Sequence, residues 1–147
     1  MNTENTGKLI VIDDNAFVLE TTSLLLSGYG FEVVSCTDPE DALKKIGSEA
    51  FDAVITDIKM PHMSGIDLLT RVVSMKKNLP VILMTAYAEL DVAIEAIKLG
   101  TFDFIIKPYK PEYLLFSVKK AVNYHRLVEM EKNYKLKLEE DVKSRTA

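Results

Sequence analysis

Short apolar runs alternate along this chain with longer segments in which apolar residues recur every three or four positions. The short runs are typical of strands buried on both faces of a parallel sheet, and the longer segments are typical of amphipathic helices. We expect strands at 8–12, 31–35, 53–56, 80–84 and 103–106, and helices at 16–27, 39–47, 64–73, 89–99 and from 111 onward. This alternation predicts an α/β, doubly wound, five-stranded parallel sheet with helices on both faces.

Residues with strong positional preferences mark where these helices begin and end. Asp38 before Pro39 is a cap followed by a first-turn proline, and Ser64 is expected to cap the next helix. Gly100 follows the fourth helix as a C-terminal cap, and Pro111 opens the last helix. The element boundaries are therefore predicted from local signals.

Composition narrows the class of protein. A chain of 147 residues is long enough for one buried core, and it shows no signal peptide and no apolar run of membrane-spanning length. Its lone cysteine, Cys36, fits a reducing compartment, so we expect a cytoplasmic protein with no membrane partner. Residues 1–116 carry a net charge of −7 and residues 117–147 one of +3. The acidic body argues against direct binding of nucleic acid by this segment.

Polar residues able to do chemistry stand at the ends of four predicted strands. Asp13 and Asp14 follow the first, Asp57 the third, Thr85 the fourth and Lys107 the fifth. Because the carboxyl ends of parallel strands share one edge of the sheet, these side chains should meet there. Each residue alone could be an ordinary turn residue, but jointly they indicate a site.

The three carboxylates repel one another, and a hard divalent cation such as Mg²⁺ would remove that conflict because it prefers oxygen ligands. A lysine and a hydroxyl opposite the carboxylates could hold the oxygens of a phosphoryl group. The constellation therefore favours phosphoryl transfer, with Asp57 as the acceptor.

These residues also stand in a known arrangement. They occur as Asp13-Asp14-Asn15, Asp57-Ile58-Lys59-Met60-Pro61 with Gly65, Thr85-Ala86, and Lys107-Pro108. In this pattern, over about residues 7–125, the chain closely resembles the receiver domains of bacterial two-component response regulators. The resemblance implies a flavodoxin-like sheet in the order 2-1-3-4-5.

The resemblance also implies a function and roles for individual residues. The chain would be a phosphorylation-dependent signalling switch, accepting a phosphoryl group on Asp57 from a sensor histidine kinase or phosphotransfer protein. Asp14, Asp57 and the backbone carbonyl of Lys59 would hold Mg²⁺ directly, and Asp13 mainly through water. Thr85 and Lys107 would bind phosphoryl oxygens, and Lys107-Pro108 would be a cis peptide.

By the same resemblance, Thr85 and Phe104 would form the switch that carries the change to the surface of the fourth helix, fifth strand and fifth helix. Phe104 lacks the hydroxyl that many members have at this position, so the switch would work by packing. Lys59 and Tyr87 are expected to crowd the path of an attacking water. The chain would catalyse only its own phosphorylation and dephosphorylation, so we do not expect an enzyme in the usual sense.

Three other readings compete with this one. A phosphatase with a strand-end Asp nucleophile would place a second Asp two residues later as general acid, where this chain has Lys59. A flavin-binding module would want a Ser/Thr/Gly-rich loop after the first strand, where Asp13 and Asp14 would repel phosphate. A receiver-like module that has lost phosphorylation would lack a site residue, and here every such position is filled.

The helical pattern of the last segment runs beyond the length a receiver domain needs. We expect residues 1–126 to form the receiver domain and residues 127–147 a helical linker extension toward an output domain absent from this sequence. Leu127, Met130, Tyr134, Leu138 and Val142 form a narrow apolar stripe, which indicates a homodimer through a short parallel coiled coil. The alternative is a solvated helix that frays at its end. His62 and His125 are both expected to face solvent.

Overall fold

The computed structural model of the chain describes residues 6–76, 78–86 and 90–146, with side chains as far as residue 140. The strands are β1 (Lys8–Ile12), β2 (Glu32–Cys36), β3 (Ala53–Asp57), β4 (Val81–Ala86) and β5 (Asp103–Lys107). The helices are α1 (Ala16–Gly28), α2 (Pro39–Ser48), α3 (Gly65–Met75), α4 (Leu90–Lys98) and α5 (Pro111–Thr146). Strands and helices alternate along the chain, as the sequence predicts.

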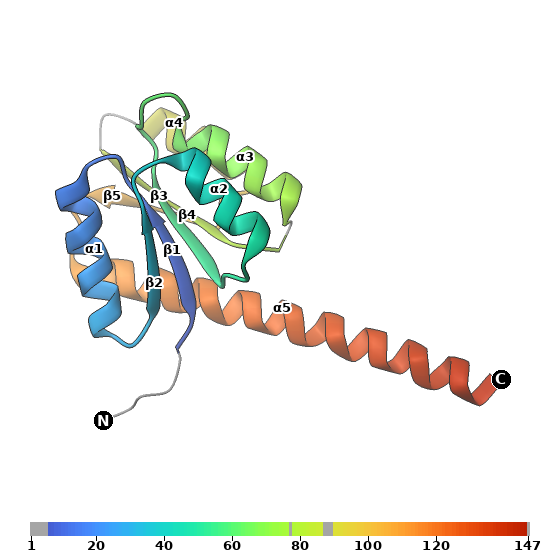
Figure 1. Ribbon diagram of the computed structural model, residues 1–147. Coiled ribbons are helices and arrows are strands. Elements are labelled where there is room, and N and C mark those ends of the chain that lie inside the picture. The colour runs from blue at the N-terminus through green and yellow to red at the C-terminus, as the bar shows by residue number, and fades with distance from the viewer. Residues whose placement is uncertain (1–5, 77, 87–89, 147) are drawn as a thin grey trace.

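The five strands form one parallel sheet in the order β2-β1-β3-β4-β5. Figure 1 shows α1 and α5 on one face of this sheet and α2, α3 and α4 on the other. This is the doubly wound, flavodoxin-like arrangement, so the predicted fold class and strand order are confirmed. The carboxyl ends of all five strands lie at one edge, which positions the site.

The core consists of two apolar layers, one on each face of the sheet. Ile10, Val54 and Leu83 point to the layer under α2, α3 and α4, and their strand neighbours point to the layer under α1 and α5. Alternate side chains of a strand emerge on opposite faces, so a strand that is covered on both sides must be apolar throughout. This explains the uninterrupted apolar runs of the sequence.

Six strand boundaries differ from the prediction by one or two residues, and two of these differences have an identifiable cause. β2 begins at Glu32 and not at Phe31, because the Phe31 amide donates to the Leu26 carbonyl at the end of α1, at 3.3 Å. β4 extends through Thr85 and Ala86, which pair with β5. A local hydrogen bond at the end of α1 sets the first limit, and pairing with β5 sets the second.

The predicted helix caps are present. Asp38 accepts from the amide of Glu40, and Ser64 and Asp67 form a reciprocal capping box at the start of α3. Gly100 adopts a φ of 101° just after α4, a conformation that glycine accepts without strain. Cys36 is buried and free.

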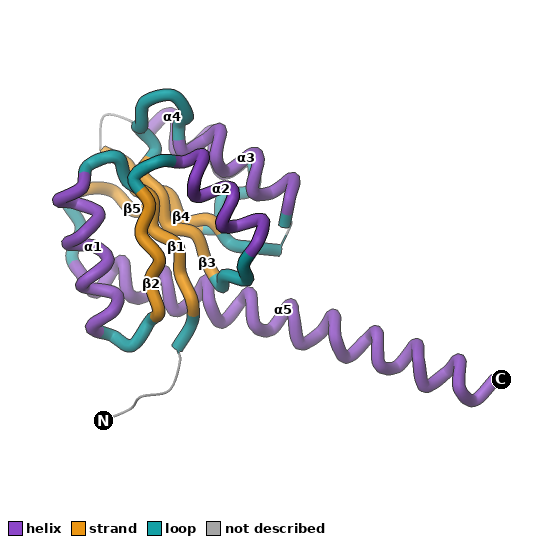
Figure 2. Tube along the Cα trace, in the orientation of Figure 1, coloured by secondary structure: helices purple, strands orange, loops and turns teal. Residues whose placement is uncertain are grey.

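α5 is much longer than the body that it packs on, and its second half projects away from the sheet (Figures 1 and 2). Its buried positions run from Leu114 to Val122, and every residue described from 130 to 140 is exposed. Among the described residues, none of the helices has both the length and the apolar character needed to cross a bilayer.

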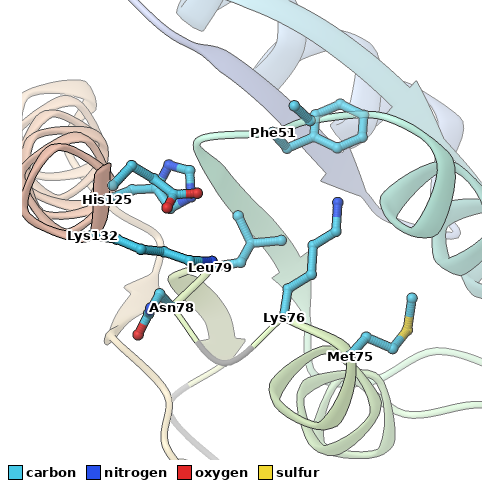
Figure 3. A pocket seen from close by; sticks show the side chains of 9 residues that line it. Phe51, Met75, Lys76, Asn78, Leu79, His125 and Lys132 are labelled. Carbon is cyan, nitrogen blue, oxygen red and sulfur yellow. The ribbon is translucent and has the colours of Figure 1, made fainter. Parts of the chain in front are cut away.

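The expectation that His125 faces solvent is wrong. Its side chain lines the pocket drawn in Figure 3 and is only 15% exposed, and Nδ1 lies 3.1 Å from Asp52 Oδ1, in the residues leading into β3. Asp52 Oδ2 also accepts the amide of Lys8, at 2.9 Å, so this carboxylate joins β1, β3 and α5. The pattern along α5 cannot reveal a partner 73 residues earlier in the chain. His62, by contrast, is exposed as expected.

Candidate functional site

A cavity of about 580 Å³ opens at the carboxyl edge of the sheet. Four strands lead into it, because residues at or just after the ends of β1, β3, β4 and β5 line it. Its lining includes five of the predicted site residues, namely Asp13, Asp14, Asp57, Lys59 and Lys107. The parallel topology therefore brings together residues that are far apart in the sequence, such as Asp13 and Lys107.

Three carboxylates converge in this cavity. Asp13, Asp14 and Asp57 each offer an oxygen, and these atoms lie within 4.8 Å of one another. Asp13 is buried, Asp57 is half-buried and Asp14 is exposed. Carboxylates this close repel when ionised, and a bound divalent cation would relieve the repulsion.

Asp13 is the most constrained of the three, with only 1% of its surface exposed. Its Oδ1 accepts the amide of Asn15 at 2.9 Å, whereas the buried Oδ2 has no hydrogen-bond partner. Burial raises the pKa of the Asp13 carboxyl, and the negative charges of Asp57 and Asp14 raise this pKa further. The hydrogen bond from the Asn15 amide and the positive charge of Lys107 lower the same pKa, but the net shift is upward. An unsatisfied buried oxygen beside two further carboxylates fits a hard cation.

Lys107 supplies the opposing charge. Its Nζ lies 3.2 Å from Asp57 Oδ2 and 3.8 Å from Asp13 Oδ2. The peptide bond between Lys107 and Pro108 is cis, as the resemblance implied. An ammonium so placed can neutralise an oxygen of a phosphoryl group carried by Asp57.

Thr85 stands apart from this group in the structure. It is fully buried, and its hydroxyl donates to the backbone carbonyl of Ala86 at 3.1 Å. Ala86 lines the cavity in its place. Phe104 is half-buried and packs against the apolar layer under α4. The predicted pair therefore lies behind the cavity, on neighbouring strands.

Gly65 belongs to the motif around Asp57, but the sequence does not reveal why this position requires glycine. Its amide donates to the Ile58 carbonyl at 2.7 Å, which closes the loop that follows Asp57. A Cβ at this position would lie 2.3 Å from the Asp57 carbonyl oxygen and 2.8 Å from Ile58 Cα. Only glycine fits, so this residue fixes the backbone that carries Asp57.

Asn15 is a second residue that motif reasoning left without a role. Its side chain caps α1 by accepting the amides of Phe17 and Val18, while its own amide holds Asp13. The signal was available, because an Asn before an amphipathic helix is a typical cap. Tyr87, expected beside the path of water, lies outside the described residues.

The burial of Asp13 has a measurable consequence, namely that Asp13→Asn should stabilise the metal-free protein. The carboxyl would titrate near 3.8 when unfolded, and its folded pKa is raised, so stability from this group falls as pH rises through the folded pKa. At pH 7 the variant should gain about 1 kcal/mol in unfolding free energy, or roughly 3 °C in Tm. Thermal unfolding without divalent cations, at pH 4 and pH 7, measures this. A variant that is less stable than the parent at pH 7 would contradict it.

Comparison with known proteins agrees with this geometry. Residues 9–119 match the model of the response regulator receiver domain. The chain is 35% identical over 121 residues to the transcriptional regulatory protein ZraR of Klebsiella oxytoca, covering 82% of this chain and 27% of that protein. It is 33% identical over 116 residues to the transcriptional regulatory protein FixJ of Bradyrhizobium diazoefficiens, covering 79% and 57%. The chain thus spans between about a quarter and a little over half of the length of these relatives.

Solved structures give the same result. A receiver domain protein from Clostridium thermocellum superposes with a TM-score of 0.79 at 33% identity, covering 82% of this chain and 98% of that one. Full-length FixJ from B. japonicum gives 0.81 at 28% identity, covering 96% and 70%. The carboxylate cluster, the fold and these matches lead to one conclusion. The chain belongs to the receiver domain family of two-component response regulators.

Proposed function

We propose that this chain is a phosphorylation-dependent signalling switch in which Asp57 accepts a phosphoryl group from a sensor histidine kinase or a phosphotransfer protein. The observation that carries the proposal is the approach of Lys107 Nζ to 3.2 Å from an Asp57 oxygen, within a cluster of three carboxylates. Of the three, only Asp57 is itself the last residue of a strand, namely β3. Family membership supplies the class of donor.

In the transfer, an oxygen of Asp57 forms a bond to phosphorus while the bond between phosphorus and the imidazole nitrogen of the donor breaks. The electron pair of that bond stays on the donor nitrogen, and because the other ring nitrogen of the donor already carries a proton, the imidazole leaves as a neutral group. Lys107 neutralises charge on the phosphoryl oxygens as they approach Asp57. Asp13 and Asp57 hold the ammonium of Lys107 over the cavity before the donor arrives.

The residues present fit Mg²⁺. Asp13, Asp14 and Asp57 would hold it together with the backbone carbonyl of Lys59, which lines the same cavity. When bound, Mg²⁺ would neutralise the carboxylates and polarise the phosphoryl group. The residue two positions after Asp57 is Lys59 and not a second acid, so the chain serves as its own substrate and not as a general phosphatase.

The readout surface in this proposal comprises α4, β5 and the first turns of α5. On this surface a cavity of about 410 Å³ is lined by Phe104 and by two exposed aromatics, Tyr113 and Phe116. Thr85 is on β4, the strand that lies between β3, which carries Asp57, and β5, which carries Phe104. Movement of the Thr85 hydroxyl from the Ala86 carbonyl toward a phosphoryl oxygen would let Phe104 repack.

This coupling is tested with beryllofluoride, which mimics a phosphoryl group. Added with Mg²⁺, it should shift amide resonances mainly between residues 85 and 120, because α4 and β5 must repack around Phe104. Heteronuclear NMR of the full chain measures the shifts, with Asp57→Asn as the unresponsive control. Shifts confined to residues within a few positions of Asp57 would count against a readout through this surface.

The domain division and the dimer also belong to the proposal. We assign residues 1–126 to the receiver domain and 127–147 to a helical linker extension. Leu127, Met130 and Tyr134 are each about two-thirds exposed, and Leu138 is 45% exposed. At spacings of three and four these side chains share one side of α5, on the part of the helix that projects from the body. A second copy of the chain, packed as a short parallel coiled coil, would cover them.

Replacing two residues of this stripe with Glu should weaken a dimer. Leu127→Glu with Tyr134→Glu should raise the dimer dissociation constant about tenfold or more, because each side chain contributes roughly 1.5–3 kcal/mol when buried. Sedimentation equilibrium with the phosphate analogue bound provides the measurement.

Leu136→Glu is the matched control for the dimer, since Leu136 is 52% exposed but lies on the other side of the helix. A chain ending at Arg126 should be monomeric. If the full chain itself sediments as a monomer at high micromolar concentration, the stripe is not a dimer seam.

A further inference from the structure

Tyr109 anchors the segment between β5 and α5 to the first helix of the chain. Its hydroxyl lies 3.3 Å from the hydroxyl of Thr22 on α1, across 87 residues of sequence. Thr22 is only 1% exposed, and the half-buried Tyr109 ring packs against the apolar layer under α1 and α5. Neither side chain lines the cavity that holds Asp57, so this pair does not act by touching a phosphoryl group.

The end of β5 receives support from outside the sheet through this pair. β5 is an edge strand, and Lys107, its last residue, pairs with Ala86 of β4 on one side. A single residue, Pro108, separates Lys107 from Tyr109, and the proline ring restricts rotation about the N–Cα bond of that residue. A displacement of Tyr109 is therefore passed on to the backbone of Lys107.

The helix that holds Tyr109 also holds the opposite side of the site. Asn15, which caps α1, donates its amide to Asp13 Oδ1 at 2.9 Å. The same helix carries Thr22, whose partner is Tyr109. Two residues before Tyr109, the ammonium of Lys107 lies 3.8 Å from Asp13 Oδ2. These contacts close a ring in which α1 fixes the ammonium relative to the carboxylates.

We propose that Thr22 and Tyr109 are positioning residues that hold the Lys107 ammonium in place for phosphoryl transfer. This role rests on the proposed function, in which the ammonium neutralises the phosphoryl oxygens that reach Asp57. The structure places Lys107 Nζ 3.2 Å from Asp57 Oδ2. A charge that is already in place stabilises a transition state better than one that must first move, and a misplacement of about 1 Å can slow a reaction up to ~100-fold.

Removal of the Tyr109 hydroxyl should leave the fold intact. A threonine hydroxyl on a helix can donate to the carbonyl one turn earlier, as Thr21 does to Phe17 at 2.9 Å. Thr22 has the same option, so Tyr109→Phe loses the bond to α1 without leaving a buried hydroxyl unpaired. The Tm of this variant should lie within about 3 °C of the parent.

The position of the ammonium is measured in the full chain, without metal or phosphoryl donor, by the NMR resonances of Lys107 Cε and Nζ. Tyr109→Phe and Thr22→Val should each shift these resonances toward their values in Asp57→Asn, because the ion pair loosens. Thr22→Ser keeps the hydroxyl and should show the parent values.

Labelling of Asp57 by acetyl phosphate and Mg²⁺ measures the consequence for transfer. Tyr109→Phe and Thr22→Val should each slow labelling about fivefold, the effect of one hydrogen bond. The double variant should be no slower than either, because both changes remove the same bond. Thr21→Val is the matched control, since Thr21 is exposed and its hydroxyl bonds within its own helix. Tyr124→Phe, on α5 and 43% exposed, controls for the loss of a tyrosine hydroxyl.

The proposal is overturned if Tyr109→Phe labels at the parent rate or leaves the Lys107 resonances unmoved. It is equally overturned if Thr22→Ser is as slow as Thr22→Val, or if the two single effects multiply in the double variant. A parent chain that takes no phosphate on Asp57 would contradict the proposed function instead, and the Lys107 resonances would then decide the positioning role alone.

Discussion

Acetyl phosphate with Mg²⁺ should add one phosphate to this protein, on Asp57, and the Asp57→Asn variant should gain none. The acceptor carboxylate lies within 4.8 Å of two others, a cluster that needs a cation before a phosphoryl dianion can approach. EDTA should therefore abolish labelling. Intact-mass measurement over time gives both the stoichiometry and the rate.

Asp14 and Lys107 should affect the rate of labelling by acetyl phosphate, and the residue closer to Asp57 should have the larger effect. Asp14→Ala should slow labelling about tenfold or more by weakening the metal site, and Lys107→Ala about a hundredfold by removing the charge 3.2 Å from Asp57. Asp41→Asn is the control, since Asp41 is an exposed acid in the first turn of α2. Phosphate on another residue, or labelling that persists in EDTA, would remove the assignment of the site.

The second large effect concerns Gly65, where replacement by Ala should lower the unfolding free energy by about 3 kcal/mol. The new Cβ would lie 2.3 Å from the Asp57 carbonyl oxygen, and both this atom and Ile58 Cα belong to the backbone and cannot rotate away. Relief would require the start of α3 or the end of β3 to shift. Because β3 carries Asp57, phosphorylation by acetyl phosphate should slow as well.

Gly28→Ala is the matched control for Gly65. Gly28 is the last residue of α1, and a Cβ there would meet nothing within 4 Å. This variant should be neutral or gain roughly 0.5 kcal/mol, because alanine reduces the entropy of the unfolded chain. Thermal unfolding of both variants, followed by labelling of each, separates stability from site geometry. A Gly65→Ala variant as stable and as active as the parent would show that the loop after Asp57 is compliant.

The sequence by itself determined the fold and the composition of the site. Uninterrupted apolar runs indicate strands that are buried on both faces. Asp38, Ser64 and Gly100 cap helices that are adjacent to them in the sequence, so these signals can be recognised from local sequence alone. In a parallel sheet every strand delivers its last residue to the same edge. The convergence of Asp13, Asp57 and Lys107 could therefore be predicted without coordinates.

Only the tertiary structure decided how those residues meet their neighbours. It turned the Thr85 hydroxyl to the Ala86 carbonyl, placed Gly65 against the backbone of Asp57, and paired His125 with Asp52 across 73 residues. Each depends on the distance between packed elements and on the rotation of a helix about its axis. A shift of about one residue in the α5 register would turn His125 by ~100° and remove its partner. Such contacts are properties of the assembled layers and are not written in any single segment.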